Sequence, residues 1–371
     1  MNLHPFRSFV VYFPDVRKGI FLSLLFLHFS SAELFSAVPD TGSSSSWQDE
    51  SFIRSFRSNP HFTFEFARRR QVLDIRNSEL DTFLLRFEPN TRTNFIASFD
   101  YKWLSLSLGL ISFPTVNGAR KGNSSQFSLR ANFNGRRVWN SNFIQLYRGF
   151  FLTNPLSVDP DWNPQIDQYP QRSDVHTTTW FSNFYYCFKP ERFSYRAAIW
   201  QLDRQEKSAG SFLAGASIRY YGLNSDSAYT LIPENAFSLF NADELIVAQR
   251  VSNLGFNIGY VHTFVYNKSW FLTLYFVPGL SLQNSVYQAQ NQQIVREPTR
   301  FVGMSEFRII TGYNGDKWFA GLSSYSISFS GNDRQGIWID NSYNWFRMFA
   351  GFRINGPSSN RKSKLLERIG L

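Results

Sequence analysis

The chain has 371 residues, of which 18% are aromatic and 18% are charged, with a net charge of +10 and a mean hydropathy of −0.28. Ordinary globular proteins carry charge on about a quarter of their residues, so this composition is unusual for a water-soluble domain. After residue 32 no apolar run approaches the roughly eighteen residues of a transmembrane helix, which argues against a helical membrane protein.

The chain begins with a segment typical of an export signal. The basic pair 17–18 precedes the apolar stretch 20–29, and small residues then lead to Ala32, where we expect cleavage. Because that stretch is too short to span a bilayer, residues 1–32 are assigned to a signal peptide. The basic pair follows an aromatic-rich stretch, which leaves open a true translation start at Val16.

Residues 33–80 form a serine-rich lead-in, which we expect to hold a first strand or a plug. Residues 81–356 are assigned to the barrel argued below. Residues 357–371 form a basic tail, expected on the periplasmic side. A solvated tail explains the positive charge of these residues without nucleic-acid binding, because no basic strip alternates with stacking aromatic residues elsewhere in the chain.

Segments of about ten residues place apolar side chains on every second position. Residues 103–112 show this most clearly, since leucines alternate with serine or glycine. A period of two indicates a strand, and runs of about nine to eleven residues are long enough for a tilted strand to cross a bilayer. The pattern favours a transmembrane β-barrel. It recurs at 62–66, 95–101, 127–133 and 319–329.

The lengths of the connections test the strand count, because such barrels have short periplasmic turns and long external loops. From residue 103 the lengths alternate, but the two halves fall out of phase across residues 222–253. A hidden strand at 228–232 or 244–250 would restore the phase. With segments near 81–88 and 92–101, this predicts about fourteen antiparallel strands with both termini periplasmic; the alternative count is twelve.

Two connections carry recognisable turn chemistry. Asn134 with Gly135, and Asn314 with Gly315, are expected to supply the positive φ angles of tight hairpins. Residues 148–174 have four prolines, four aspartates and no alternation, so this segment is expected to be an external loop or one folded into the lumen.

Three stretches in the middle of the chain carry a family resemblance: 147–150 (YRGF), 193–198 (FSYRAA) and 205–211 (QEKSAGS). They resemble an exported family of Gram-negative bacteria that is catalogued as a domain of unknown function (four-four-two-one). The resemblance implies an outer-membrane β-barrel over most of the chain after residue 80. It implies no established activity, and it carries no functional residue over to this sequence.

Arg196 is the one candidate site residue. In a strand over 193–202, Phe193 and Tyr195 share one face, and Arg196 lies on the other and faces the lumen. A lumen arginine could select anionic solutes by making the pore more positive. It could equally pair with a lumen carboxylate and close the barrel, and we favour this pairing because isolated charges inside narrow barrels usually find partners.

Histidine limits any catalytic hypothesis. The mature chain keeps His61, His176 and His262, and His176 is the best candidate base because it is expected near the outer rim. No Gly-x-Ser-x-Gly motif occurs, so we expect a hydrogen-bonding role for His176 and no enzymatic activity. No catalytic residue, metal site or cofactor site is predicted. Asp333 and Asp340 lack the spacing of a calcium loop, and the lone Cys187 excludes an intramolecular disulfide.

Aromatic clusters at 180–186 and 338–346 are typical of the aromatic girdles at a membrane interface, although sugar-stacking platforms are an alternative. The sequence therefore predicts a barrel of the Gram-negative outer membrane, acting as a passive pore or as a structural or surface barrel. Its expected partners are outer-membrane lipid and the assembly machinery, with the ligand unknown. The alternatives are a barrel-embedded lipid-modifying enzyme and a secreted soluble carbohydrate-binding β-protein.

Overall fold

The computed structural model describes residues 48–77, 83–114, 118–226, 230–240, 245–291, 293–330, 337–339 and 343–354. The chain divides into two compact units, residues 1–46 and 47–371, and the description below concerns the second. The expected signal peptide, the start at Val16 and the tail 357–371 lie outside the described residues.

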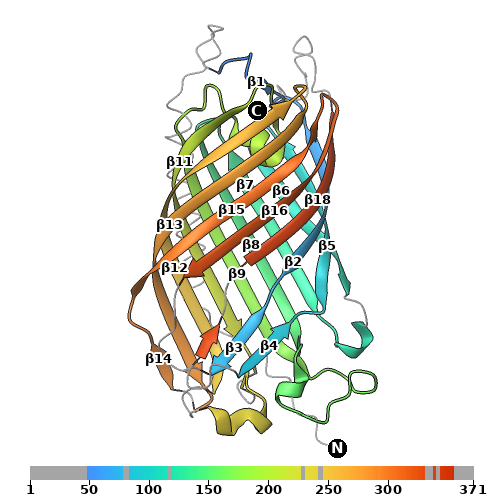
Figure 1. Cartoon of the computed structure of the whole chain (residues 1–371), viewed down its shortest axis with the longest axis vertical. Coiled ribbons are helices and arrows are strands. Elements are labelled where there is room, and N and C mark those ends of the chain that lie inside the picture. Colours follow the sequence, from blue (N-terminus) through green and yellow to red (C-terminus); the bar gives the residue numbers. More distant parts are fainter. Residues whose placement is uncertain are drawn as a thin grey trace, which may run out of the picture. The chain divides into compact units, whose positions relative to one another are not determined.

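Twelve strands of the described chain close into an antiparallel barrel (Figure 1). Each strand pairs with the next around the ring, and the pairing of the first barrel strand with the last closes it. The predicted antiparallel barrel is confirmed, with the alternative count of twelve. In ring order its strands are β2 (His61–Arg70), β5 (Thr91–Tyr101), β6 (Leu104–Pro114), β7 (Ser125–Asn134), β8 (Val138–Leu152), β9 (Gln171–Cys187), β11 (Ala209–Asn224), β12 (Ile246–Tyr266), β13 (Trp270–Ala289), β15 (Arg300–Asn314), β16 (Trp318–Ser330) and β18 (Tyr343–Arg353).

The remaining elements lie off the ring. A two-stranded sheet joins β1 to β10, and β3, β4, β14 and β17 attach at the opposite end of the barrel in Figure 1. No helix among the described residues is long and apolar enough to cross a membrane. The elements that lie off the ring are β1 (Ile53–Ser55), β3 (Leu73–Asn77), β4 (Leu84–Glu88), η1 (Gly118–Arg120), η2 (Pro155–Ser157), η3 (Arg196–Trp200), β10 (Asp203–Gln205), η4 (Glu234–Leu239), β14 (Ile294–Arg296) and β17 (Ile337–Ile339).

The predicted count of fourteen strands differs from the observed twelve-stranded barrel at four segments of the chain. The predicted strand near 81–88 is the short β4, which pairs with only the end of β8. The segment 193–202 is not a strand, and the region expected to hide one contains η4 and the first residues of β12. The lead-in supplies the fourth difference, because its β2 is a barrel strand, so the barrel begins at His61 and not at residue 81.

All short turns of the described barrel lie at one end, and the long connections lie at the other, except the connection 188–208 between β9 and β11, which lies at the short-turn end. His61 at the start of β2 pairs with Arg353 at the end of β18, so the first and last barrel strands meet at the short-turn end. The positive φ angles expected at Asn134, Gly135, Asn314 and Gly315 do not occur; in the described hairpins of the barrel they fall at Lys102 and at Asn267–Lys268, and elsewhere at Gly122, Gly149 and Gln201.

Side chains alternate between an apolar outer wall and a mostly polar lumen. On β2, Phe64 and Phe66 are 44% and 52% exposed, whereas Glu65 between them is 1% exposed. β16 reverses this pattern, since Phe319 and Tyr325 point inward together with Ser323, whereas Ser324, Ser326 and Ser328 line the outer wall. Phe319 and Tyr325 are buried there because the lumen beside β16 is packed with other aromatic rings.

Three apolar clusters follow one another along the interior. The cluster at the short-turn end contains Trp139, Phe193 and Phe319. The middle cluster contains Phe143 and Trp345. The third cluster, toward the long-loop end, is built from β3, β4 and the segment around η4 together with neighbouring barrel strands: Leu73, Ile75, Leu85, Phe87, Tyr147, Phe150, Leu152, Val175, Tyr221, Leu223, Leu231, Ile232, Ala236, Ile246, Val251 and Tyr287.

Candidate functional site: the barrel interior

The connection between β9 and β11, residues 188–208, folds inward and forms a plug at the short-turn end. It contains the single π-helical turn η3 and the short strand β10, and Phe193, Ala198 and Ile199 are completely buried. β1 of the lead-in pairs with β10, from Ile53 opposite Gln205 to Ser55 opposite Asp203. The lead-in therefore contributes both a plug element and a barrel strand.

Arg196 lies in η3 and not on a strand, so the strand predicted over 193–202 is wrong. Its side chain is 3% exposed, and its Nε donates to Oδ2 of Asp203 at 3.1 Å. Its Nη1 donates to the backbone oxygens of Lys102 and Asn134, at 2.7 and 3.0 Å. Arg196 thus lies within the barrel, where it pairs with a carboxylate and connects the plug to two wall turns.

Asp203 is the counter-ion at the centre of the plug. It accepts hydrogen bonds from the hydroxyls of Ser194 at 2.8 Å and Ser55 at 3.0 Å, besides the guanidinium of Arg196. Burial opposes its ionisation, but Arg196 and the two hydroxyls outweigh this effect and hold the pKa of Asp203 below its usual value. The pair is therefore ionised at neutral pH and satisfied by hydrogen bonds.

The plug is attached to several parts of the wall. Arg353 of β18 donates to the backbone oxygen of Gln201 at 2.5 Å, and Arg347 of the same strand donates to that of Ile199 at 2.9 Å. Asn314 of β15 donates to the backbone oxygen of Asp203 at 2.9 Å. These contacts explain why Asn314 keeps strand geometry, since its side chain points into the lumen and holds the plug.

Above the plug, two glutamates organise a layer of buried charges. Glu65 accepts a hydrogen bond from Arg347 at 2.9 Å and lies 3.8 Å from Nη1 of Arg130. Glu306 accepts hydrogen bonds from Arg219 at 2.7 Å and from Tyr275 at 3.2 Å. Both carboxylates are at most 1% exposed, so each needs these cationic partners to remain charged inside the barrel.

Aromatic rings cross the lumen at the same level. Phe143 of β8 and Trp345 of β18 come from strands five positions apart in the ring of twelve, yet their ring centroids are 6.2 Å apart. The guanidinium carbon of Arg308 lies 3.8 Å from the centroid of the Tyr325 ring. Side chains from nearly opposite walls therefore meet in the middle of the barrel.

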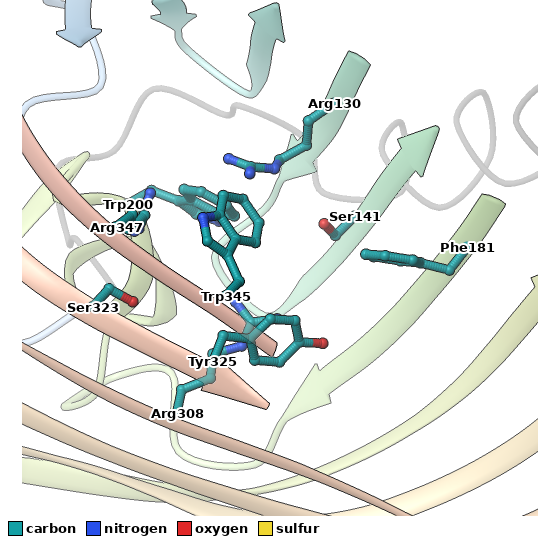
Figure 2. Close-up of a pocket in the computed structure, with 9 residues that line it drawn as sticks. All are labelled: Arg130, Ser141, Phe181, Trp200, Arg308, Ser323, Tyr325, Trp345 and Arg347. Atoms are coloured by element: carbon teal, nitrogen blue, oxygen red, sulfur yellow. The ribbon is translucent and has the colours of Figure 1, made fainter. Parts of the chain in front are cut away.

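A small cavity remains in this layer (Figure 2). Its volume is about 20 Å³. Figure 2 shows Trp345 in the middle of these side chains with Trp200 of the plug beside it, and five kinds of group line the cavity: guanidinium, indole, phenyl, phenol and hydroxyl. The lining residues are Arg130, Ser141, Phe181, Trp200, Arg308, Ser323, Tyr325, Trp345 and Arg347.

The three histidines lie apart. His176, the candidate base, has its Nδ1 3.3 Å from the backbone oxygen of Asp174 and lies at the long-loop half of β9. His262 is on the outer wall beside Tyr260 and Phe264, and His61 is buried beside Arg353. Among the described residues, none of the three is hydrogen-bonded to a serine side chain, and no group of three metal-ligating side chains occurs.

The segment 148–174 does not enter the lumen as one piece. Its ends extend β8 and β9, and the part between them forms a loop beyond the long-loop end, where Ile166 is 76% exposed (Figure 1). The aromatic cluster at 180–186 is divided between the two faces of β9, since Phe181 and Tyr185 are buried in the lumen and Tyr186 lies on the outer wall. The cluster at 338–346 lies partly outside the described residues.

The charged layer is not predicted from the sequence, although a signal for it is present. Glu65, Arg130, Glu306 and Arg347 each occupy the polar register of an alternating strand, one position from an apolar neighbour. A charge in that register faces the lumen. Which charges meet depends on distances across the barrel, and a single sequence does not supply these.

Several solved outer-membrane barrels are similar to this chain at low identity. The outer membrane protease OmpT from Escherichia coli has 9% identity and a TM-score of 0.35, and the match covers 83% of this chain and 100% of that one. The translocator domain of the autotransporter NalP from Neisseria meningitidis has 7% identity and a TM-score of 0.30, covering 94% and 100%. The Pseudomonas putida toluene transporter TodX has 10% identity and a TM-score of 0.28, covering 80% and 90%.

No protein with curated information matches the sequence. The family described as "Domain of unknown function (DUF4421)" matches residues 47–354, which include every described barrel strand and the plug. The chain belongs to this family.

Proposed function

We propose that the protein is an outer-membrane barrel with a closed lumen, which acts as a structural or surface-interaction protein and not as an open passive pore. The observation that carries this proposal is the filled interior: the plug, the charged and aromatic layer, and the third apolar cluster follow one another along the barrel axis. Rings from nearly opposite walls lie 6.2 Å apart in the middle layer, which leaves no width for a hydrated solute there.

The outer wall supports placement in the outer membrane of a Gram-negative bacterium. Large apolar side chains face outward on strands all around the ring, including Phe64, Leu106, Phe212, Phe256 and Phe276, each at least 42% exposed. A water-soluble carbohydrate-binding barrel would not expose such a band, because contiguous apolar surface is costly in water. Outer-membrane lipid is the partner that this wall fits, and insertion would use the outer-membrane assembly machinery.

We propose no catalytic role for His176, because its described contact is a backbone oxygen and not a nucleophilic hydroxyl. The surface available for interaction is the long-loop end, where the connection around η2 extends beyond the barrel.

Single-channel recording in planar bilayers tests the closed lumen. The full-length protein and a variant lacking residues 156–168 would be compared, with folding verified by heat-modifiable migration on gels. We expect no steady current from either protein, because the closure lies inside the barrel and not in the external loop. Steady current steps from the unmodified protein would contradict a closed lumen, and steps from the loop variant alone would place the closure in the loop.

A further inference from the structure

Two exposed arginines flank one valine on the outer wall at the long-loop end. Arg250 of β12 pairs with Val286 of β13, and Val286 pairs on its other edge with Arg296 of β14. Directly paired residues of antiparallel strands point to the same face of the sheet. Val251 and Tyr287, which follow two of these residues, are buried in the third apolar cluster, so the arginines and Val286 point away from the lumen.

Neither arginine is paired with a carboxylate in the described part of the chain. Both side chains are exposed, and no hydrogen bond or ion pair of either guanidinium occurs among the described residues. Glu297 follows Arg296, but its backbone N–H donates to the oxygen of the lumen-facing Ser285 at 3.0 Å. Two strand spacings of about 4.8 Å place the Cα atoms of the two arginines about 10 Å apart. Long side chains at this separation can bind one anion between them.

The two arginines lie just beyond the apolar part of the wall. Leu254, Leu282 and Phe301 form one row across β12, β13 and β15 and are 47%, 40% and 70% exposed. Arg250 and Val286 lie four residues farther along their strands, or about 13 Å, which a strand tilt of about 40° reduces to about 10 Å along the membrane normal. An arginine side chain bridges part of this distance, because its apolar stem lies along the wall and its charged end stays in the polar region.

Aromatic side chains lie between the apolar row and the arginines. Tyr220 of β11 pairs with Ser252 of β12 and, on its other edge, with Trp180 of β9. Phe181 and Tyr221, which follow them, are buried in the lumen, so Trp180 and Tyr220 point outward. Tryptophan and tyrosine on the outer face of a barrel gather at the boundary between membrane and water. The arginines therefore lie at the level of the lipid headgroups.

We propose that Arg250 and Arg296 together bind a phosphate group of lipopolysaccharide. This inference rests on the proposed placement in a Gram-negative outer membrane with the long loops outside, because the outer leaflet there consists of this phosphorylated glycolipid. Guanidinium groups bind phosphate through paired N–H donors, and the adjoining apolar wall receives the acyl chains. A soluble anion contacts the arginines but not the wall, so the site favours a lipid phosphate over a free one.

Lipid retention tests the ligand, with bisphosphorylated lipid A compared against the same lipid after dephosphorylation. Native mass spectrometry of the purified protein in detergent counts the lipids that stay bound. We expect the bisphosphorylated form to bind at least about tenfold more tightly, because each arginine near an anionic lipid contributes about fivefold. Equal binding of the two forms, or equally tight binding of phosphatidylglycerol, would overturn the assignment. Displacement of lipid A by an equal concentration of inorganic phosphate would show a free-anion site and would also overturn it.

The double variant Arg250→Gln with Arg296→Gln tests the residues, with folding verified by heat-modifiable migration on gels. We expect it to bind bisphosphorylated lipid A about 25-fold more weakly than the unmodified protein, from about fivefold for each arginine. Lys268→Gln with Lys317→Gln is the matched control. It removes the same charge from exposed positions in two turns at the opposite end of the barrel, and it should bind as the unmodified protein does. Equal binding by the two double variants would contradict the arginine site.

Insertion into phosphatidylcholine vesicles separates this inference from the proposed function. A protein that inserts into these vesicles but binds both forms of lipid A equally keeps its membrane placement and loses the arginine site. A protein that enters no vesicle and binds neither form would overturn both. Insertion together with selective binding of the bisphosphorylated form supports both.

Discussion

The buried pair of Arg196 and Asp203 makes the plug sensitive to a single charge. Replacing Asp203 with Asn leaves Arg196 ionised and without its counter-ion, which we expect to lower the free energy of unfolding by about 3–5 kcal/mol. Urea unfolding in detergent, followed by tryptophan fluorescence, measures this loss. Asp49→Asn is the control, because the Asp49 carboxylate accepts a local backbone hydrogen bond from Ser51 at 2.9 Å and lies outside the plug core. Equal unfolding curves for the two variants would contradict a central role of the pair.

The same residue predicts how the plug responds to acid. The folded-state pKa of Asp203 is lowered, so its ionised form stabilises the fold above the unfolded value of about 3.9, and that stability is lost as the pH falls through the lower folded value. We therefore expect the unmodified protein to lose stability below about pH 4. Asp203→Asn should lack this contribution. The difference in unfolding free energy between the two proteins should shrink as the pH falls, and a constant difference would contradict the assignment.

At the scale of single residues, the sequence predicted that Arg196 is inside the barrel and left its role open between ion selection and pairing. The structure places it 3.1 Å from Asp203, in a segment that the sequence did not identify as a plug. Glu65 and Glu306 were not predicted as sites. Two of their partners, Arg130 for Glu65 and Arg219 for Glu306, come from strands that are not adjacent in the ring, and strand periodicity contains no information about such distances.

At the scale of elements, the plug shows why periodicity fails locally. Phe193, Tyr195 and Ile199 occupy alternate positions and so predict a strand, but Arg196 and Ala198 between them are buried as well. A turn of helix inside a closed barrel is buried on all sides, so its apolar pattern has no exposed face. This misread strand also explains why the loop lengths lost their phase, since it added a crossing that the barrel does not contain.

The reactivity of the single cysteine measures how tightly the plug packs against the barrel wall. Cys187 is 0% exposed and lies in the same apolar cluster as Tyr195, whose ring centroid is 3.4 Å from that of Trp139. Tyr195→Ala removes this stacked ring, and we expect Cys187 to react with a maleimide at least about tenfold faster, because local opening of the plug becomes less costly. Phe212→Ala, on the outer wall, is the control. Equal labelling rates for both variants would indicate that plug packing does not limit access to the thiol.

At the scale of the whole molecule, the apolar wall predicts where an added charge is costly. Phe276 of β13 is 54% exposed on the outer face. If lipid covers this face, Phe276→Arg should reduce the free energy of folding into vesicles by about 2–4 kcal/mol. Ile294→Arg is the control, because Ile294 is 60% exposed on β14 at the long-loop end. Equal small effects for both would contradict a lipid-facing wall.

The barrel closes where the first strand, β2, meets the last strand, β18. Arg347 of this seam binds Glu65 across the junction and also the backbone oxygen of Ile199 in the plug, and Arg353 binds that of Gln201. The seam therefore acquires its full set of contacts only after residues 188–208 occupy the interior. A barrel that closes around an empty interior leaves each of these two seam arginines short of one acceptor, so we expect the plug to complete the junction between the first and last strands.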